Sequence, residues 1–91
     1  MELEFHWDAA NIRHIARHGV TTEEGEQVFA NDPMIVGRQD YPEEERSLCF
    51  GRTNGGKFLT VIYTERKGRI RVVTAYRMTR AQQRMYLTGR W

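Results

Sequence analysis

Arginine side chains are concentrated in one strand-forming stretch, residues 63–77. Alternation along a strand places four side chains of its second half on one face, namely Ile70, Val72, Thr74 and Tyr76. The opposite face then carries Arg69, Arg71, Val73 and Ala75. An arginine rooted in a strand is preorganised to bind an oxyanion such as phosphate through two parallel hydrogen bonds. The alternative is that Arg69 and Arg71 only solvate the open face of an antiparallel sheet.

Two histidines, His14 and His18, lie four residues apart in a stretch with helical periodicity. They therefore share a helix face, and imidazole is suited to acid–base chemistry near neutral pH. The spacing is also that of a two-histidine metal site, and His18 precedes Gly19, where a histidine often interacts with a helix C-terminus. Because no carboxylate or cysteine at helical spacing completes a ligand set, we expect no metal and no other cofactor.

The elements that must position these side chains are predicted to form a single small α+β domain over residues 1–91, since a chain of 91 residues has room for one modest core. The predicted order is a strand at 3–7, a helix at 9–18, a second helix from 21 to about 31, strands at 34–38, 46–53, 57–64 and 70–76, and a helix at 80–87. The turns at 54–56 and around Gly68 make the four later strands an antiparallel meander.

Polar caps and apolar spacing define the ends and faces of these elements. Three residues are predicted N-caps: Asp8, Thr21 and Thr79. Thr21 and Glu24 have the spacing of a capping box. The first strand is expected to bury Leu3, Phe5 and Trp7. The first helix is expected to turn Ile12, Ile15 and Ala16 to the core.

Charge is divided unequally along the chain. Residues 1–45 carry 11 acidic and 3 basic side chains, a net charge of −8, whereas residues 46–91 carry 1 acidic and 11 basic ones, a net charge of +10. Such asymmetry favours a surface that attracts polyanions such as nucleic acid, with the acidic part facing a basic protein partner. If the fold interleaves the two halves, the charges neutralise each other instead.

Neither a membrane span nor a signal peptide is predicted, because no apolar run approaches about 20 residues and the N-terminus carries Glu2 and Glu4. We therefore expect a cytoplasmic protein. The single cysteine, Cys49, lies between apolar residues and is expected to pack in the core rather than act as a nucleophile.

Several short motifs occur in a familiar order from about residue 5 to residue 87. They are Trp7-Asp8, His14-Ile15-Ala16-Arg17-His18-Gly19-Val20-Thr21, Asp32-Pro33, Glu45-Arg46, Tyr63-Thr64-Glu65-Arg66, Ile70-Arg71-Val72 and Tyr86. Together they resemble the BrnT family. The resemblance implies a RelE-like α/β fold and a ribonuclease toxin of a type II toxin–antitoxin pair. It also implies a BrnA-like antitoxin that holds the toxin inactive, in a complex that binds its own promoter DNA.

The family's recurring pattern is matched by His18, Thr64, Arg66 and Arg71, and Arg17 stands where a basic residue usually precedes the histidine. Two positions depart from it. Tyr76 replaces an arginine that typically ends the last strand, and Gln82 stands where a glutamate often opens the final helix. Arg77 could substitute for the missing arginine only if the strand frays or bulges, because a one-residue shift turns a side chain to the opposite face.

The leading hypothesis is metal-independent RNA cleavage, in which a ribose 2′-hydroxyl attacks the adjacent phosphate. This reaction needs a base, an acid and cations that stabilise the charge developing on phosphorus. The predicted catalytic residues are His18, Glu65, Arg66, Arg71, Tyr76 and Arg77, with His14 a further acid–base candidate. The predicted RNA-binding residues are Arg17, Arg69, Arg80 and Arg84.

An unpaired base could stack on an aromatic ring, as single-stranded RNA recognition commonly requires. The candidates are Trp7, Tyr63 and Tyr76. The alternative function is a non-catalytic module of the same fold that binds RNA or an antitoxin-like protein through the basic sheet.

Overall fold

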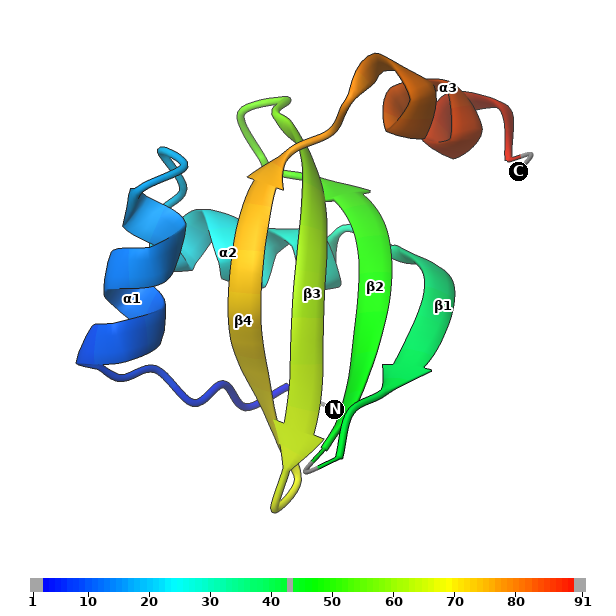
Figure 1. Cartoon of the computed structure of the whole chain (residues 1–91). Coiled ribbons are helices and arrows are strands. Elements are labelled where there is room, and N and C mark those ends of the chain that lie inside the picture. Colours follow the sequence, from blue (N-terminus) through cyan, green and yellow to red (C-terminus); the bar gives the residue numbers. More distant parts are fainter. Residues whose placement is uncertain (1–2, 43, 90–91) are drawn as a thin grey trace.

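A computed structural model describes residues 3–42 and 44–89. Its elements are α1 (Ala9–Ala16), α2 (Thr22–Ala30), β1 (Met34–Asp40), β2 (Glu45–Arg52), β3 (Phe58–Arg66), β4 (Arg69–Arg77) and α3 (Arg80–Thr88). The four strands form one antiparallel sheet in the order β1-β2-β3-β4. In Figure 1, α2 crosses behind the sheet, α1 stands beside β4, and α3 lies at the end of the sheet where β4 finishes. The predicted α+β class and four-stranded meander are therefore confirmed.

The predicted first strand is wrong in extent. Phe5 makes only an isolated parallel bridge to Ile70, supported by hydrogen bonds of 2.8 Å from the amide of His6 to the Ile70 carbonyl and from the Ile70 amide to the Glu4 carbonyl. Asp8 begins the cap of α1 three residues later, so the segment is too short for a ladder. Leu3 is exposed rather than buried, whereas Phe5 packs against the core.

The cap of α1 is reciprocal. Asp8 Oδ1 accepts hydrogen bonds from the amides of Ala10 at 3.0 Å and Asn11 at 3.1 Å, and Asn11 Oδ1 accepts one from the Asp8 amide at 2.7 Å. These bonds satisfy amide groups that have no partner within the helix. The helix ends at Ala16 rather than His18, and a turn leads to Gly19, whose positive φ of 74° suits a residue without Cβ.

The buried face of α1 differs from the predicted one. Ile15 is fully buried as expected, but Ile12 is 42% exposed and Ala16 is exposed. Asn11, one turn before Ile15, is buried instead, and its Nδ2 donates to the His6 carbonyl at 3.0 Å. A buried side-chain amide is tolerated when its hydrogen bonds are made, so Asn11 can lie on the buried face of the helix.

Helix α2 packs tightly across the sheet. The predicted capping box is confirmed, because Glu24 donates its amide to Thr21 Oγ1 while its carboxylate accepts from the Thr21 amide. Val28 is fully buried against β2, where a Cβ placed on Gly51 would lie only 2.6 Å from Val28 Cγ1. The absence of a side chain at Gly51 therefore lets the helix approach the strand.

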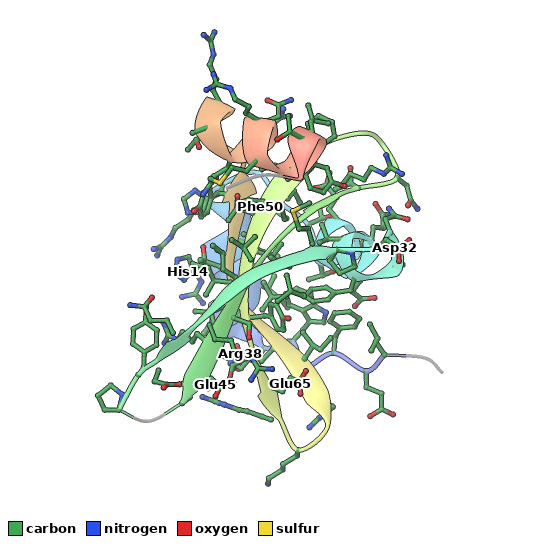
Figure 2. The ribbon with its side chains drawn as sticks, turned by 90° about the vertical axis from the view of Figure 1, so that its right-hand side faces the viewer. His14, Asp32, Arg38, Glu45, Phe50 and Glu65 are labelled. Carbon is green, nitrogen blue, oxygen red and sulfur yellow. The ribbon has the colours of Figure 1, made fainter. Side chains whose placement is uncertain are left out.

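The core lies between the sheet and the first two helices. Its buried apolar members are Ile15, Val20, Val28, Cys49, Leu59, Val61, Tyr63, Ile70, Val72 and Ala75. Cys49 packs there as predicted, and burial raises the pKa of its thiol to about 12. In Figure 2 the sheet is seen from the side, with α2 and Asp32 on one side of it and His14 on the other.

A bulge in β4 changes which residues share a face. Ile62 pairs with Thr74 and Tyr63 pairs with Val72, so Val73 is an extra residue without a partner in the register. The predicted alternation beyond Val73 is therefore wrong, because one added residue reverses the faces of those that follow. Ala75 is fully buried in the core, and Tyr76 lies on the same face as Arg71.

We call this second face, the one that carries Arg71 and Tyr76, the outer face of the sheet. On β3 it carries Thr60 and Thr64, the register partners of Tyr76 and Arg71. The hairpin from β1 to β2 borders it. Strand β1 runs beyond the predicted 34–38, since Gln39 and Asp40 still pair with β2.

Candidate active site

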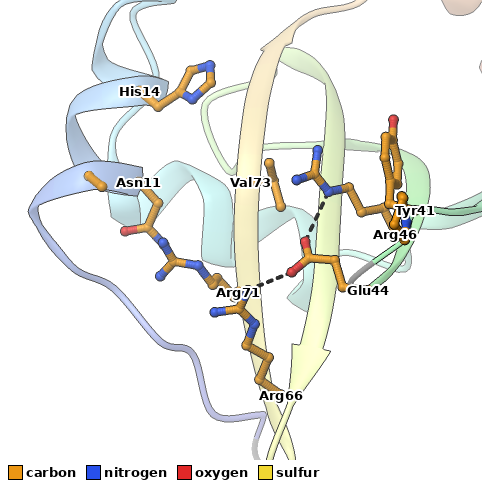
Figure 3. A pocket seen from close by; sticks show the side chains of 10 residues that line it. Asn11, His14, Tyr41, Glu44, Arg46, Arg66, Arg71 and Val73 are labelled. Carbon is orange, nitrogen blue, oxygen red and sulfur yellow. Dashed lines mark hydrogen bonds and ion pairs between the residues drawn. The ribbon is translucent and has the colours of Figure 1, made fainter.

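An open pocket of about 490 Å³ lies on the outer face, between α1 and the β1–β2 hairpin (Figure 3). Its polar lining comes from three parts of the chain: α1, the hairpin and the strands. The residues concerned are Asn11, His14, Glu44, Arg46, Arg66 and Arg71. We call it the arginine pocket, after Arg46, Arg66 and Arg71.

Arg71 is held in place by the cap of α1. Its Nη1 donates to Asp8 Oδ2 at 2.8 Å, and its side chain is only 17% exposed. Chiefly because of this hydrogen bond, and also because the Asn11 amide donates to it, the pKa of Asp8 falls to about 2. The other N–H groups of Arg71 have no hydrogen-bond partner among the described residues, so they remain able to bind an anion.

Glu44 joins the other two arginines of the pocket. One of its carboxylate oxygens pairs with Arg66, and the other lies 3.0 Å from Arg46 Nε. Both contacts hold the pKa of Glu44 below its ordinary value, with Arg66 the larger cause. The guanidinium of Arg46 also lies 4.4 Å from the ring centre of Tyr41. The Glu44 carboxylate is thus held between two guanidinium groups, at a position where a phosphate could bind in its place.

His14 is the only histidine among the described residues that lines this pocket. Figure 3 shows it on α1 beyond Asn11, at the opposite end of the pocket from Arg66. Its ring stacks near that of His18, with centroids 6.2 Å apart and planes inclined by 29°. The two rings are therefore neighbours although His18 lies in the turn after α1, and His14 rather than His18 lines the arginine pocket.

His18 and Tyr76 are brought together just outside the pocket. Their ring centroids are 6.2 Å apart. The Tyr76 hydroxyl accepts a long hydrogen bond of 3.4 Å from Gln82 Nε2, and Gln82 Oε1 accepts one of 2.8 Å from Thr60 Oγ1. Tyr76 and Gln82 are therefore in contact with each other.

The remaining predicted site residues are not gathered in the arginine pocket. Glu65 lies opposite Ile70 on the α2 side of the sheet, and Arg77 lies opposite Leu59 at the end of β4. The four predicted RNA-binding residues are exposed and form no ion pair with any residue the structure describes: Arg17, Arg69, Arg80 and Arg84. They remain predictions for RNA contact.

The two oppositely charged parts of the sequence interleave at the site. In every ion pair of the described part of the chain, the carboxylate belongs to residues 1–45. The cation belongs to residues 46–91 in each of these pairs except the one formed by Arg38. Carboxylates therefore neutralise the charges of the arginine pocket, whereas the four exposed arginines predicted to bind RNA form no ion pair with described residues.

Two of the three predicted stacking residues are occupied by internal contacts. Tyr63 is 8% exposed and meets Phe29 edge-on, at 4.9 Å between ring centroids. Trp7 stacks on Phe5 and donates its indole N–H to Glu26 at 2.8 Å. Tyr76, half-buried on the outer face, is the remaining candidate.

The sequence interpretation did not assign Asn11, Tyr41, Glu44 and Arg46 to a site. Local signals existed for Asn11, which stands three residues after the cap Asp8 and completes a capping box, and for Arg46, which lies in the motif Glu45-Arg46. Glu44 and Arg46 come together with Arg66 through the sheet register, which no local pattern encodes.

A family model described as the ribonuclease toxin BrnT of type II toxin–antitoxin systems matches residues 7–82. The chain belongs to the BrnT family. The match spans more than half of the chain and includes the whole arginine pocket. No curated protein matched the sequence. Membership implies that this BrnT protein has an RNA substrate and an antitoxin partner.

No group of three or more histidine, cysteine, aspartate or glutamate side chains in residues 3–42 and 44–89 could hold a metal ion. Within the same residues, no helix is both long and apolar enough to cross a membrane.

Proposed function

We propose that this BrnT protein cleaves RNA without a metal and that the arginine pocket binds the scissile phosphate. The observation that carries the proposal is the convergence of Arg46, Arg66 and Arg71 beside His14. Glu44 already bridges two of these guanidinium groups. A phosphate that displaced its carboxylate would find the same donors, with Arg71 as a third.

The pocket supplies the charge that the reaction needs. Attack by the ribose 2′-oxygen forms a bond to phosphorus, the bond to the 5′-oxygen breaks, and a 2′,3′-cyclic phosphate results. Negative charge grows on the phosphoryl oxygens during this step, and fixed guanidinium groups stabilise it. Arginine suits the role because it stays charged and offers several donors.

His14 is the proposed acid–base group. A neutral imidazole can take the proton of the 2′-hydroxyl, and an imidazolium can protonate the leaving 5′-oxygen. This proposal replaces the predicted His18 by its neighbour one turn earlier, because His14 lines the pocket. Glu65 and Arg77, which lie on the other face of β3 and β4, have no part in it.

A BrnA-like antitoxin is proposed to neutralise the toxin in the cytoplasm, and the complex of the two is proposed to bind promoter DNA. What supports this part is the family membership, which implies an antitoxin of some kind. A RelE-like fold is also proposed, on the resemblance in sequence.

The alternative is a non-catalytic module that binds RNA or protein. It is favoured by the ion pairs in the pocket, because Asp8 and Glu44 occupy all three arginines. In that case the pocket would be a structural network rather than a phosphate site.

Expression in cells separates these functions. We expect induced wild-type protein to arrest growth, and the Arg71→Ala variant, at equal protein level, to be harmless. The matched control is Arg52→Ala, which removes an exposed arginine at the end of β2 without an ion pair to the described residues. It should stay toxic. An Arg71→Ala variant as toxic as the wild type would overturn the phosphate assignment.

A further inference from the structure

We propose that His18, Tyr76 and Gln82 form a nucleobase-binding subsite beside the arginine pocket, an inference that rests on the proposed function. The ligand class is the base of a single-stranded ribonucleotide whose phosphate lies in the pocket. The subsite combines an aromatic surface with uncharged hydrogen-bonding groups.

A row of rings leads out of the pocket along α1. His14 lines the pocket, His18 lies in the turn that follows α1, and Tyr76 comes next, with 6.2 Å between successive ring centroids. One turn is about 5.4 Å along the helix axis, a step comparable with the size of a nucleotide. His18 is exposed and Tyr76 only half-buried, so a base can reach these rings.

The β4 bulge makes this arrangement possible. Because Val73 is an extra residue, Tyr76 returns to the outer face and shares it with Arg71. Without the bulge, Tyr76 would face the core and Ala75 would take its place. The same shift turns Arg77 to the opposite face, beside its partner Leu59, and so keeps its charge away from the rings.

Hydrogen bonds fix the polar edge of the subsite. Gln82 Oε1 accepts from Thr60 Oγ1 at 2.8 Å and from the Thr79 amide at 3.0 Å, which turns Gln82 Nε2 toward Tyr76. The Tyr76 oxygen accepts from that nitrogen, so its own hydroxyl hydrogen is free to donate. Gln82 Nε2 also keeps its second hydrogen, and both donors suit acceptor atoms on a base edge.

The charge pattern distinguishes the two parts of the site. The arginine pocket carries three guanidinium groups, as a phosphate requires, whereas Tyr76, Gln82 and Thr60 form a neutral network. Aromatic rings beside cationic groups are the usual combination in proteins that bind single-stranded nucleic acid. The neutral part therefore fits the base and the cationic part fits the backbone.

The test is an NMR titration of the folded protein with inorganic phosphate, the ribonucleosides and the nucleoside 3′-monophosphates. None of these probes requires cleavage. For at least one base, the nucleotide should bind about tenfold more tightly than inorganic phosphate, as base stacking predicts. Resonances of His18, Tyr76 and Gln82 should respond to the base, and those of Arg71 to the phosphate.

Two variants at one position form the matched pair. Tyr76→Phe keeps the ring and should retain most of the nucleotide's advantage over phosphate. Tyr76→Leu keeps an apolar side chain without a ring and should lose that advantage, while its affinity for inorganic phosphate stays unchanged. His18→Ala, at an exposed position, should also lower nucleotide binding alone.

The outcomes separate this inference from the proposed function. If phosphate binds but no nucleotide binds more tightly, the subsite is overturned and the pocket stands. Equal losses of phosphate and nucleotide in Tyr76→Leu would also overturn it, because Tyr76 would then only support the pocket. Nucleosides that bind where phosphate does not would overturn the pocket and support the subsite. If no probe binds, both proposals fail.

Discussion

Arg71 and Asp8 form an ion pair in which the two carboxylate oxygens of Asp8 accept hydrogen bonds from different groups. Oδ1 of Asp8 caps the first amides of α1, whereas Oδ2 lies 2.8 Å from Arg71 Nη1. The start of the helix is thereby fixed near the start of β4. Because α1 also carries His14, the same contact sets the position of the histidine relative to the arginine pocket.

Stability should fall at acid pH through Asp8. An unfolded chain binds a proton at this carboxylate near pH 3.8, whereas the folded protein does so only at about 2. The stabilising effect is therefore complete above pH 4 or so and is lost as the pH falls toward 2. Chemical denaturation at a series of pH values should show a steeper loss for the wild type than for Asp8→Asn. Identical profiles would contradict this role of Asp8.

Removing the charge of Glu44 should strengthen anion binding. Glu44→Gln frees Arg46 and Arg66 from a competing carboxylate, and we expect a severalfold higher affinity for a non-cleavable 2′-O-methyl oligonucleotide, measured by fluorescence anisotropy. Glu45→Gln is the control, since Glu45 pairs only with the exposed Arg38 in the described structure. Weaker binding by Glu44→Gln would show that Glu44 positions the arginines instead of competing for them.

Gly51→Ala should destabilise the fold. The new methyl group would lie 2.6 Å from Val28 Cγ1, so α2 would have to move away from β2. Overpacking of this kind costs about 1–3 kcal/mol, which a urea titration resolves. Gly37→Ala adds the same group where no atom lies within 4 Å, and its stability should barely change. Equal effects of the two substitutions would contradict the packing described.

The buried face of α1 can be tested by a pair of substitutions. Ile15→Ala removes a fully buried side chain and should cost about 2–5 kcal/mol of unfolding free energy. Ile12→Ala removes one that is 42% exposed and should cost much less. Thermal and urea denaturation would give both values. A larger loss of unfolding free energy in Ile12→Ala than in Ile15→Ala would contradict the buried face described here.

The predictions from sequence were best where the signal is local. Asp8, Thr21 and Thr79 cap their helices as expected, because a cap depends on residues within one turn. The four-stranded meander was also predicted, since apolar runs and glycine turns define its hairpins. The first strand was not, because its pairing with Ile70 depends on a distant partner.

The site was harder to predict because register decides it. Alternation placed Tyr76 opposite to Arg71, but the bulge at Val73 unites them on one face, and nothing in residues 70–76 marks a bulge. Arg66 and Arg71 were predicted to bind phosphate. Glu44 and Arg46 join them only through pairing between separate strands.

RNA cleavage by the purified protein in excess EDTA tests the central claim most directly. The wild type should cleave total RNA and leave 2′,3′-cyclic phosphate ends. Arg71→Ala, with its fold verified by circular dichroism and thermal melting, should be slower by about 100-fold, a usual cost of losing one group that stabilises the transition state. Arg52→Ala should match the wild type. Intact RNA in every sample free of antitoxin, or undiminished cleavage by Arg71→Ala, would contradict the claim that the arginine pocket catalyses metal-independent cleavage.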